Sequence, residues 1–368
     1  MSRHRSHEVL DAINACGGRV KIYQTIRTAH LERATEFAPA VYLYRQRRYD
    51  FDAQLASRVK AYQSSIWQTA WLLLRARVSF LEVNEPLMRE GLAGSLLAAL
   101  AVRLNPGRKA QVVSYALENL DPFSRPAATW KSKLRIQLDR RLSRSLSSRL
   151  DRLCYGTPGA EQLYRTLLSP GSDIKQELIP ALPATCHCEE LPRAGVPTLV
   201  FIGDFSPRKG LDAVLAAWPT VRDGLPEARM VLIGKGQLTA QVQELAASDE
   251  RVEIHLDPPR LLIHENLRRS HVLVLPSRRT PRWREQVGLP IVEALAHGCH
   301  VVTTDETGLA SWLDENGHTV IDHRDLDTEL ASKLSTALAH AATQLETPTV
   351  LPEVDGRHAA DLWMHREG

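Results

Sequence analysis

Residues 193–322 alternate between two patterns of apolar and polar positions. Short β-branched runs predict buried strands at Thr198–Ile202, Arg229–Ile233, Val252–Leu256, Val272–Leu275, Cys299–Thr303 and Thr319–Ile321. Between them, apolar residues recur every three or four positions and predict helices at Leu211–Trp218, Gln237–Ala247, Leu261–Arg269 and Pro290–His297. Strands that alternate with helices form a parallel sheet covered on both faces, so we expect a Rossmann-like α/β domain.

The first half of the chain repeats this pattern less regularly. Candidate strands lie at Arg19–Tyr23, Val41–Tyr44, Val78–Val83, Gln111–Tyr115 and Leu153–Tyr155. Helical periodicity is found around residues 53–76, 86–104 and 130–150. A second α/β domain is therefore expected, and two such domains would face a central cleft in which a ligand can bind.

A proline-rich segment without periodicity, Ala181–Pro197, is typical of a linker. We place the boundary within it, between an N-terminal domain of residues 1–192 and a C-terminal domain of residues 193–345. The remaining tail, 346–368, predicts a short last helix, which is a candidate to return to the N-terminal domain.

The composition is that of a globular protein, with 43% hydrophobic and 24% charged residues among 368. The most apolar stretch, Leu92–Leu104, is shorter than the roughly 18–20 residues that a membrane-spanning helix needs. Five cysteines are too few for a disulfide framework, and the N-terminus has no apolar leader. These features predict reduced thiols and a cytoplasmic location.

Charge is distributed unevenly along the chain. Residues 1–190 carry 28 Lys+Arg and 18 Asp+Glu, a balance of +10, whereas residues 191–368 carry 18 and 25, a balance of −7. This is either chance variation between two solvated surfaces or a sign that the first half meets an anionic surface or acceptor.

The segment 125–149 concentrates eight basic residues and a single acid, Asp139. Behind Trp130, leucine recurs every four residues from Leu134 to Leu150, which predicts a basic amphipathic helix. Either the helix packs on the core with a solvated basic face, or it contacts an anionic membrane.

The densest group of candidate site residues lies between Val272 and Asp305. There a buried strand leads into an Arg-rich loop, and Gly288-Leu289-Pro290 then opens a helix. The backbone amides of Gly288 and Leu289 can seat phosphate oxygens.

Two glutamates flank this helix start, Glu285 in the loop and Glu293 inside the helix. Because helical side chains lean towards the N-terminus, Glu293 can point back to the ligand and accept hydrogen bonds from hydroxyls such as a ribose diol. The alternative is structural: Glu293 complements the helix dipole and Glu285 is a solvated loop charge.

Two glycine-containing turns end other strands at the same edge of the predicted sheet. The first, GDFSPRKG from Gly203 to Gly210, places Arg208 and Lys209 together, where they can neutralise a diphosphate or remain solvated. The second, IGKG, begins at Ile233.

The order of these motifs resembles a known family. GDFSPRKG, VLIGKG, LPS, the Glu285…Glu293 pair and EALAHGCHVVTT are similar to the nucleotide-sugar-binding domain of family-4 glycosyltransferases over about residues 198–322. The resemblance implies two Rossmann-like domains in the GT-B arrangement.

The resemblance also implies roles for particular residues. Lys209, with Arg208, is expected to bind the donor diphosphate beside Gly203, and the backbone of Gly288 and Leu289 to contact the distal phosphate or the sugar. Glu293 is expected to hold the ribose, and Glu285 the hydroxyls of the transferred sugar. Together with the Arg208 and Lys209 side chains, Glu285 forms the catalytic set that the family implies.

The implied activity is transfer of a hexose-type sugar from a nucleotide-diphosphate sugar (UDP-, GDP- or another) to a glycan, lipid-linked or small-molecule acceptor. Members of the family retain the anomeric configuration and need no metal or other cofactor. The expected location is cytoplasmic, with a peripheral position on the inner face of the membrane as an option.

The sequence departs from the family in several places. Asp204 stands where many relatives have Arg. The landmark Ser6-His7-Glu8-Val9 comes so early that either the first strand and its glycine loop are lacking or the N-terminus is divergent. The strand and loop Gln111–Asn119 has no cleft His. Glu118 and Asn119 stand in its place, either as acceptor-side groups or as a strand-terminating turn.

Other functional classes are less consistent with the sequence. Cys186-His187-Cys188 has no second pair at zinc-finger spacing, so no metal site is predicted. Nucleic-acid binding is disfavoured because the basic residues lack interleaved aromatic ones. The departures leave open a catalytically degenerate scaffold that binds a partner or membrane, and a nucleotide-sugar epimerase of the same architecture.

Overall fold

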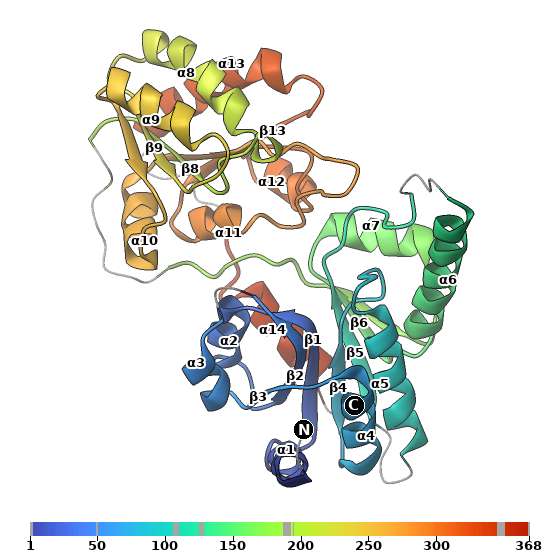
Figure 1. The fold of residues 1–368 in the computed structure, drawn as a ribbon. Helices are drawn as coiled ribbons and strands as arrows, with labels where there is room; N and C mark the ends of the chain where they lie inside the picture. Colours follow the sequence, from blue (N-terminus) through green and yellow to red (C-terminus); the bar gives the residue numbers. More distant parts are fainter. Residues whose placement is uncertain are drawn as a thin grey trace. The chain divides into compact units, whose positions relative to one another are not determined.

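The computed structural model describes residues 3–48, 51–105, 110–124, 129–186, 193, 195–343 and 350–366. The chain divides into two compact units (Figure 1). Unit 1 comprises Met1–Gly156, Ala160–Ile179 and Arg357–Gly368, and unit 2 comprises Thr157–Gly159 and Pro180–Gly356. The boundary expected at residue 192 and the expected start of the tail at residue 346 lie outside the described residues.

Unit 1 is built on a parallel sheet in the strand order β3-β2-β1-β4-β5-β6-β7. Its strands are β1 Arg19–Ile26, β2 Val41–Arg47, β3 Ala61–Gln63, β4 Phe80–Val83, β5 Gln111–Ala116, β6 Arg152–Tyr155 and β7 Lys175–Leu178. The predicted strands correspond to β1, β2, β4, β5 and β6. The edge strands β3 and β7 were not predicted, because β3 is very short and β7 has two exposed polar residues.

Helices cover both faces of this sheet. They are α1 Arg3–Ala15, α2 Thr28–Ala34, α3 Ala53–Arg58, α4 Ile66–Arg75, α5 Leu92–Leu104, α6 Trp130–Ser147, α7 Pro158–Leu167 and α14 Gly356–Met364. Side chains from α1, α4, α5, α6 and α7 share one apolar cluster with Val20 and Leu81. Side chains from α2, α3 and α14 form separate clusters with strand residues such as Tyr44 and Val113.

Two expectations for the first half are corrected. The helix expected around residues 53–76 is interrupted by β3, and Ser65 caps the N-terminus of a new helix, α4. The helix expected around residues 86–104 begins only at Leu92. Ser6-His7-Glu8-Val9 lies in α1, which precedes β1, and β1 is an inner strand of the sheet.

Unit 2 contains a second parallel sheet in the order β10-β9-β8-β11-β12-β13. Its strands are β8 Thr198–Ile202, β9 Arg229–Ile233, β10 Val252–His255, β11 Val272–Leu275, β12 His300–Thr304 and β13 Thr319–Ile321. All six predicted strands are confirmed, with ends shifted by at most one residue. The two sheets confirm the predicted fold class of two Rossmann-like α/β domains.

The helices of unit 2 lie on either side of its sheet (Figure 1). They are α8 Leu211–Gly224, α9 Thr239–Ser248, α10 Arg260–Arg269, α11 Leu289–Ala296, α12 Ala310–Glu315 and α13 Leu326–Thr343. Helices α8, α9 and α13 lie on one side, and α10, α11 and α12 on the other. Helix α8 continues past the predicted end at Trp218, because Pro219 is accommodated inside it.

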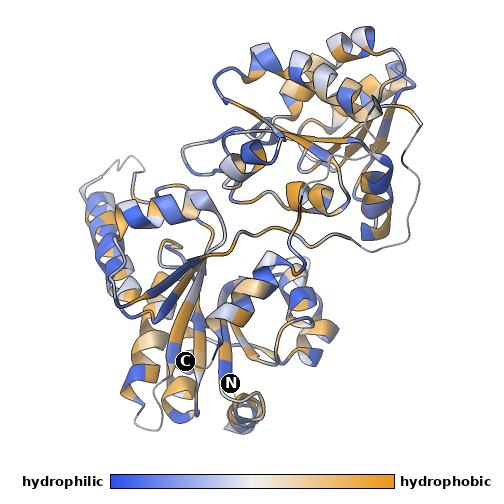
Figure 2. Ribbon diagram, turned by 180° about the vertical axis from the view of Figure 1, so that it is seen from behind, coloured by the Kyte–Doolittle hydropathy of each residue, from blue (hydrophilic) through white to orange (hydrophobic). Residues whose placement is uncertain are grey.

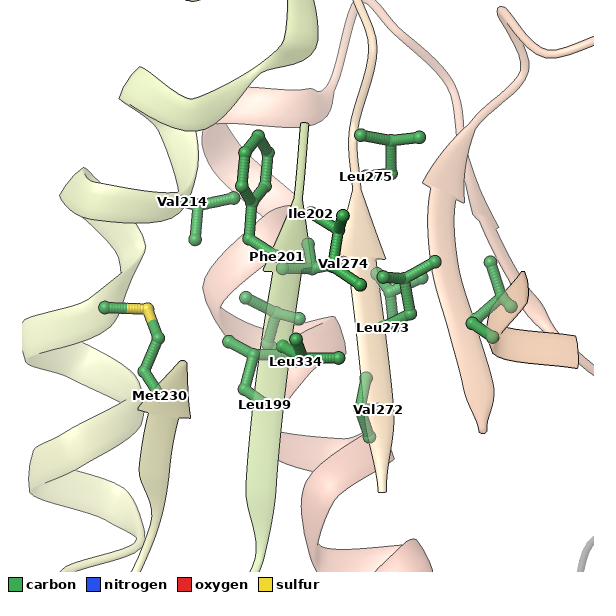
Figure 3. Packing of buried hydrophobic residues seen from close by; sticks show 14 of the residues in the cluster. Leu199, Phe201, Ile202, Val214, Met230, Val272, Leu273, Val274, Leu275 and Leu334 are labelled. Atoms are coloured by element: carbon green, nitrogen blue, oxygen red, sulfur yellow. The ribbon is translucent and has the colours of Figure 1, made fainter. Parts of the chain in front are cut away.

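The strands at the centre of unit 2 are buried on both faces, which explains their unbroken apolar sequences. Leu199, Phe201 and Val274 are fully buried, and Figure 3 shows them packed with Val214 and Leu334 of the covering helices. In Figure 2 the central strands are mainly hydrophobic, whereas the helices carry both kinds of residue.

A buried ionic cluster attaches α14 to the sheet of unit 1. Lys21 on β1 pairs with Glu82 on β4 at 2.9 Å and contacts Asp361 of α14. Arg357 of α14 contacts Glu82 as well, and the Arg152 guanidinium donates to the carbonyl of Trp363 at 2.7 Å. Burial alone would raise the pKa of Glu82, but the cations of Arg357 and Lys21 lower it to about 2.

Candidate functional site

Two glycines let the loops at the carboxyl edge of the unit 2 sheet lie directly against each other. Gly210 has φ +74°, and a Cβ there would lie 2.0 Å from the carbonyl oxygen of Pro276, just after β11. Gly234 has φ +148°, and a Cβ there would lie 1.9 Å from the carbonyl oxygen of Gly203, just after β8. The ends of β8, β9 and β11 are therefore brought together, with the residues of the GDFSPRKG motif between them.

Lys209 and Glu285 form an ion pair at this edge. The Ser277 hydroxyl donates a hydrogen bond of 3.0 Å to the same Glu285 oxygen that contacts the lysine ammonium. The side chains of Lys209 and Glu285 are only 13% and 11% exposed, so the pair is largely shielded from water. The structure thus joins two of the predicted site residues. It adds Ser277, which belongs to the LPS motif but received no role from the sequence.

Trp283 lies beneath both predicted cations. Its ring centroid is 4.7 Å from Cζ of Arg208 and 5.0 Å from Nζ of Lys209. An aromatic face attracts cations and here holds two of them side by side. Arg208 also pairs with Asp204 at 3.2 Å, and both of these side chains are partly exposed. Sequence reasoning missed Trp283, whose only signal was its place in the Arg-rich loop.

Glu306 binds two arginines of the Arg-rich loop. Its carboxylate is fully buried and accepts from Nε of Arg279 at 2.5 Å and from Nε of Arg284 at 2.7 Å. The loop that carries Trp283 and Glu285 is therefore fixed at both sides by charge-assisted hydrogen bonds.

Helix α11 begins where the sequence predicts. Gly288 is its N-cap residue with φ +81°, and its carbonyl accepts hydrogen bonds from the amides of Ile291 at 2.9 Å and Val292 at 3.2 Å. Leu289, the first helical residue, is half exposed. The first turn of a helix offers backbone amides without intrahelical partners, which is the property expected of a phosphate seat.

Glu293 lies further along α11 and pairs with Arg260 of α10. The distance from Nη2 of Arg260 to Oε1 of Glu293 is 3.0 Å, and the glutamate side chain is 12% exposed. Burial raises the pKa of Glu293, and the opposing charge of Arg260 offsets part of this effect. Arg260 was not predicted, because it lies 33 positions earlier on a different helix.

In unit 1, Glu118 and Asn119 lie in the turn after β5. The amide of Leu120 donates to the Glu118 side chain at 3.1 Å, and Asn119 is buried. Glu85, which the sequence analysis did not single out, accepts from the amides of Leu117 and Glu118 at 3.0 Å each and from the Tyr164 hydroxyl at 2.8 Å. Burial, followed by the charge of Glu118, raises the pKa of Glu85 to about 7.

The basic helix α6 has two different ends. Leu146 and Leu150 are buried in the unit 1 core, whereas Trp130, Leu134 and Leu138 are 70%, 58% and 53% exposed. A four-residue repeat drifts by about 40° per step around a helix of 3.6 residues per turn, so the start and the end of the repeat face opposite sides. The leucine repeat is therefore divided between an exposed start and a buried end, and residues 125–128 of the predicted segment lie outside the described ones. Among the described helices, none is both long and apolar enough to cross a bilayer.

Comparisons with known proteins agree with the motif order. Residues 196–340 match the family model of the glycosyl transferases group 1, which confirms the resemblance seen in the sequence. The chain is 30% identical over 178 residues to the GDP-mannose-dependent alpha-(1-6)-phosphatidylinositol monomannoside mannosyltransferase of Mycolicibacterium smegmatis. That match covers 46% of this chain and 45% of the relative, so the chain spans less than half the length of this curated protein.

Solved structures share the fold along most of the chain. The lipopolysaccharide outer core galactosyltransferase WaaB has a TM-score of 0.62 at 11% identity, covering 88% of this chain and 91% of that one. The lipopolysaccharide-biosynthesis glycosyltransferase WaaG has a TM-score of 0.59 at 13% identity, covering 95% and 100%. Anabaena HepE, solved with UDP, has a TM-score of 0.58 at 12% identity, covering 94% and 99%.

Proposed function

We propose that this protein, whose residues 196–340 match the glycosyl transferases group 1, is a retaining, metal-independent glycosyltransferase. It moves a hexose-type sugar from a nucleotide-diphosphate sugar to a glycan, lipid-linked or small-molecule acceptor. The observation that carries the proposal is the shielded Lys209–Glu285 pair, which Ser277 also contacts.

The cations beside Trp283 are the proposed seat of the donor diphosphate. Negative charge grows on this group as its bond to the sugar breaks, and Lys209 and Arg208 stabilise it electrostatically. Because the two cations are already held in place by Trp283, Asp204 and Glu285, little reorganisation is needed during transfer. In this proposal the side chains and the amides at Gly288 and Leu289 supply the stabilisation that other enzymes obtain from a divalent cation.

The two glutamates recognise different parts of the donor. The carboxylate of Glu285 contacts Lys209, the proposed diphosphate ligand, and Ser277. A sugar bound next to the diphosphate therefore lies close enough to Glu285 for its hydroxyls to donate hydrogen bonds to the carboxylate oxygens. Glu293 lies on the helix behind the phosphate seat and binds the ribose, with Arg260 maintaining its charge. Gly203 keeps the backbone close to the diphosphate. On the acceptor side, Glu118 and Asn119 remain the candidates.

A panel of nucleotide sugars tests the proposal. The names of the similar proteins mention GDP-mannose, a galactosyltransferase and UDP, so GDP-mannose and UDP-linked hexoses are the first donors to measure. A donor at 100 times its dissociation constant adds about 2.7 kcal/mol to the stability of the folded state. Stabilisation followed by sugar transfer to an acceptor supports the enzyme. Stabilisation without any turnover indicates a degenerate scaffold, and conversion of the free nucleotide sugar to an isomer indicates an epimerase.

We also propose that α6 brings the protein to an anionic membrane surface. Trp130, Leu134 and Leu138 are exposed, and the helix also carries Lys131, Lys133, Arg135, Arg140, Arg141 and Arg144. Exposed apolar side chains beside basic ones suit the boundary between headgroups and acyl chains. In this proposal the enzyme works at the inner face of a membrane, where a lipid-linked acceptor would be available.

A further inference from the structure

A cysteine and two histidines from separate parts of unit 2 converge behind the proposed ribose site. Cys186 lies in the segment that enters the unit, His264 is on α10, and His297 follows α11. One ligand atom from each lies within 4.8 Å of the others. Nδ1 of His264 and Nε2 of His297 are 3.2 Å apart.

We propose that Cys186, His264 and His297 form a binding site for a zinc ion. Thiolate sulfur and imidazole nitrogen are preferred zinc ligands, and three protein ligands leave a fourth tetrahedral position for water. Two nitrogens at about 2.0–2.1 Å from a tetrahedral zinc lie roughly 3.3–3.4 Å apart, close to the spacing of the two imidazoles.

The surroundings hold the ligands in the orientation that metal binding needs. Nδ1 of His297 lies 2.7 Å from the carbonyl oxygen of Glu293; when this nitrogen carries the proton, Nε2 presents its lone pair to the site. The amide of Cys186 donates to the carbonyl of Ala296 at 2.9 Å, which fixes the cysteine backbone against the end of α11.

Charge identifies the thiolate as the decisive ligand. Only the Cys186 thiolate among the three ligands can offset the charge of the ion. A soft or borderline ion such as zinc is therefore expected, whereas magnesium and calcium prefer oxygen ligands.

The other groups of possible ligands in the described residues are less suitable. Glu82, Asp361 and His365 enclose the ammonium of Lys21, which already neutralises their carboxylates. Asp305 accepts from the backbone of His323, and Asp322 pairs with Arg324, so that group is held by its own ion pairs.

A zinc ion at this position would connect the entering segment to α10 and α11. Arg260 lies on α10 and its partner Glu293 on α11. An ion that connects the two helices would therefore stabilise the proposed ribose site without contacting the diphosphate. The site is independent of the proposed transfer reaction, and its test does not require turnover.

The experiment uses the full, tag-free chain, reduced and freed of metal, titrated with ZnCl₂ in competition with a chromophoric chelator. We expect one equivalent to bind in the micromolar range or more tightly, with a higher melting temperature. Co²⁺ should bind at the same site and give a thiolate-to-cobalt charge-transfer band. Cys186→Ser should abolish this band and weaken zinc binding at least tenfold, and His264→Gln should weaken it similarly.

His340→Gln, at an exposed histidine of α13, is the matched control and should bind zinc as the parent does. Cys186→Ser retains the backbone bond to Ala296 and should fold normally, as its circular dichroism would show. Zinc binding much weaker than micromolar, or tight binding that Cys186→Ser and His264→Gln leave unchanged, would overturn the proposal.

Discussion

Lys209 and Glu285 are 76 positions apart in the chain and form one ion pair at the carboxyl edge of the unit 2 sheet. Glu285 also accepts a hydrogen bond from Ser277, so its carboxylate is shared between a cation and a hydroxyl. A donor that binds here must share the lysine with Glu285. The lysine is therefore positioned before any ligand arrives, and the glutamate is held close to the sugar that would follow.

Removing the lysine should weaken donor binding directly. For Lys209→Ala we expect the dissociation constant of the nucleotide sugar to rise at least tenfold, about 1.4 kcal/mol, because one diphosphate contact is lost. Isothermal titration would measure this. Lys333→Ala, an exposed lysine of α13 that pairs with Glu329, is the control and should not change binding. Activity of the parent should persist in excess chelator; loss that magnesium or manganese restores would contradict a metal-independent diphosphate seat.

Substitution of the two glutamates should affect different steps, nucleotide binding for Glu293 and turnover for Glu285. Glu293→Gln should weaken the free nucleotide diphosphate and the intact donor equally, because both contain the ribose. Glu285→Gln should leave binding of the free nucleotide diphosphate nearly unchanged, while turnover falls by two or more decades, roughly 2.7 kcal/mol of transition-state stabilisation.

Glu293→Gln should not lower the melting temperature by more than a few degrees, since the side chain of its partner Arg260 is 56% exposed and the amide still accepts hydrogen bonds. If folded Glu285→Gln lost nucleotide diphosphate binding, the division of roles would be wrong. If both variants transferred sugar at the parent rate, the proposed site would have to be abandoned.

The central strands of unit 2 were predictable because they are local apolar runs that pack on both faces, as Leu199 and Phe201 do, whereas the edge strands β3 and β7 have no such run. The site residues were predictable individually, because glycine turns and helix starts have local signals. Their pairing was not predictable: nothing in the sequence around Glu293 indicates Arg260, and nothing around Lys21 indicates Asp361, 340 positions away. Such contacts arise only when the parallel strands have been ordered into a sheet.

The ionic cluster under α14 makes a stability prediction. Lys21→Met leaves Glu82 and Asp361 buried with one fewer cation, and breaking a buried pair in this way costs about 3–5 kcal/mol. Lys333→Met removes only an exposed ion pair, worth about 0–1 kcal/mol. Hydrogen exchange measured on peptides from β1 and α14 reports on unit 1 directly. Equal protection of these peptides in the two variants would show that the cluster does not hold α14.

Glu85 should make the stability of unit 1 depend on pH. Burial raises its pKa to about 7 on folding, so the folded state binds the proton more tightly than the unfolded state. The resulting stabilisation is present at low pH and is lost as the pH rises through about 7. Glu85→Gln cannot ionise, so its melting temperature should fall less than that of the parent between about pH 5.5 and about pH 8. Parallel curves for the two proteins would refute this assignment.

Helix α6 should bind anionic vesicles in a salt-sensitive manner. Each Lys or Arg near such a surface contributes about 1 kcal/mol, and the contribution is screened as salt is added. Sedimentation with phosphatidylglycerol vesicles should therefore exceed sedimentation with phosphatidylcholine vesicles at low salt, and the difference should shrink at high salt.

Replacing Leu134 and Leu138 by Ser should reduce binding, because these exposed side chains would enter the acyl boundary. Leu261→Ser, at an equally exposed leucine of α10, is the matched control and should bind as the parent does. Equal sedimentation with both kinds of vesicle at low salt would leave α6 as a solvated basic helix, packed on the core through side chains such as Ile136, Leu142 and Leu146.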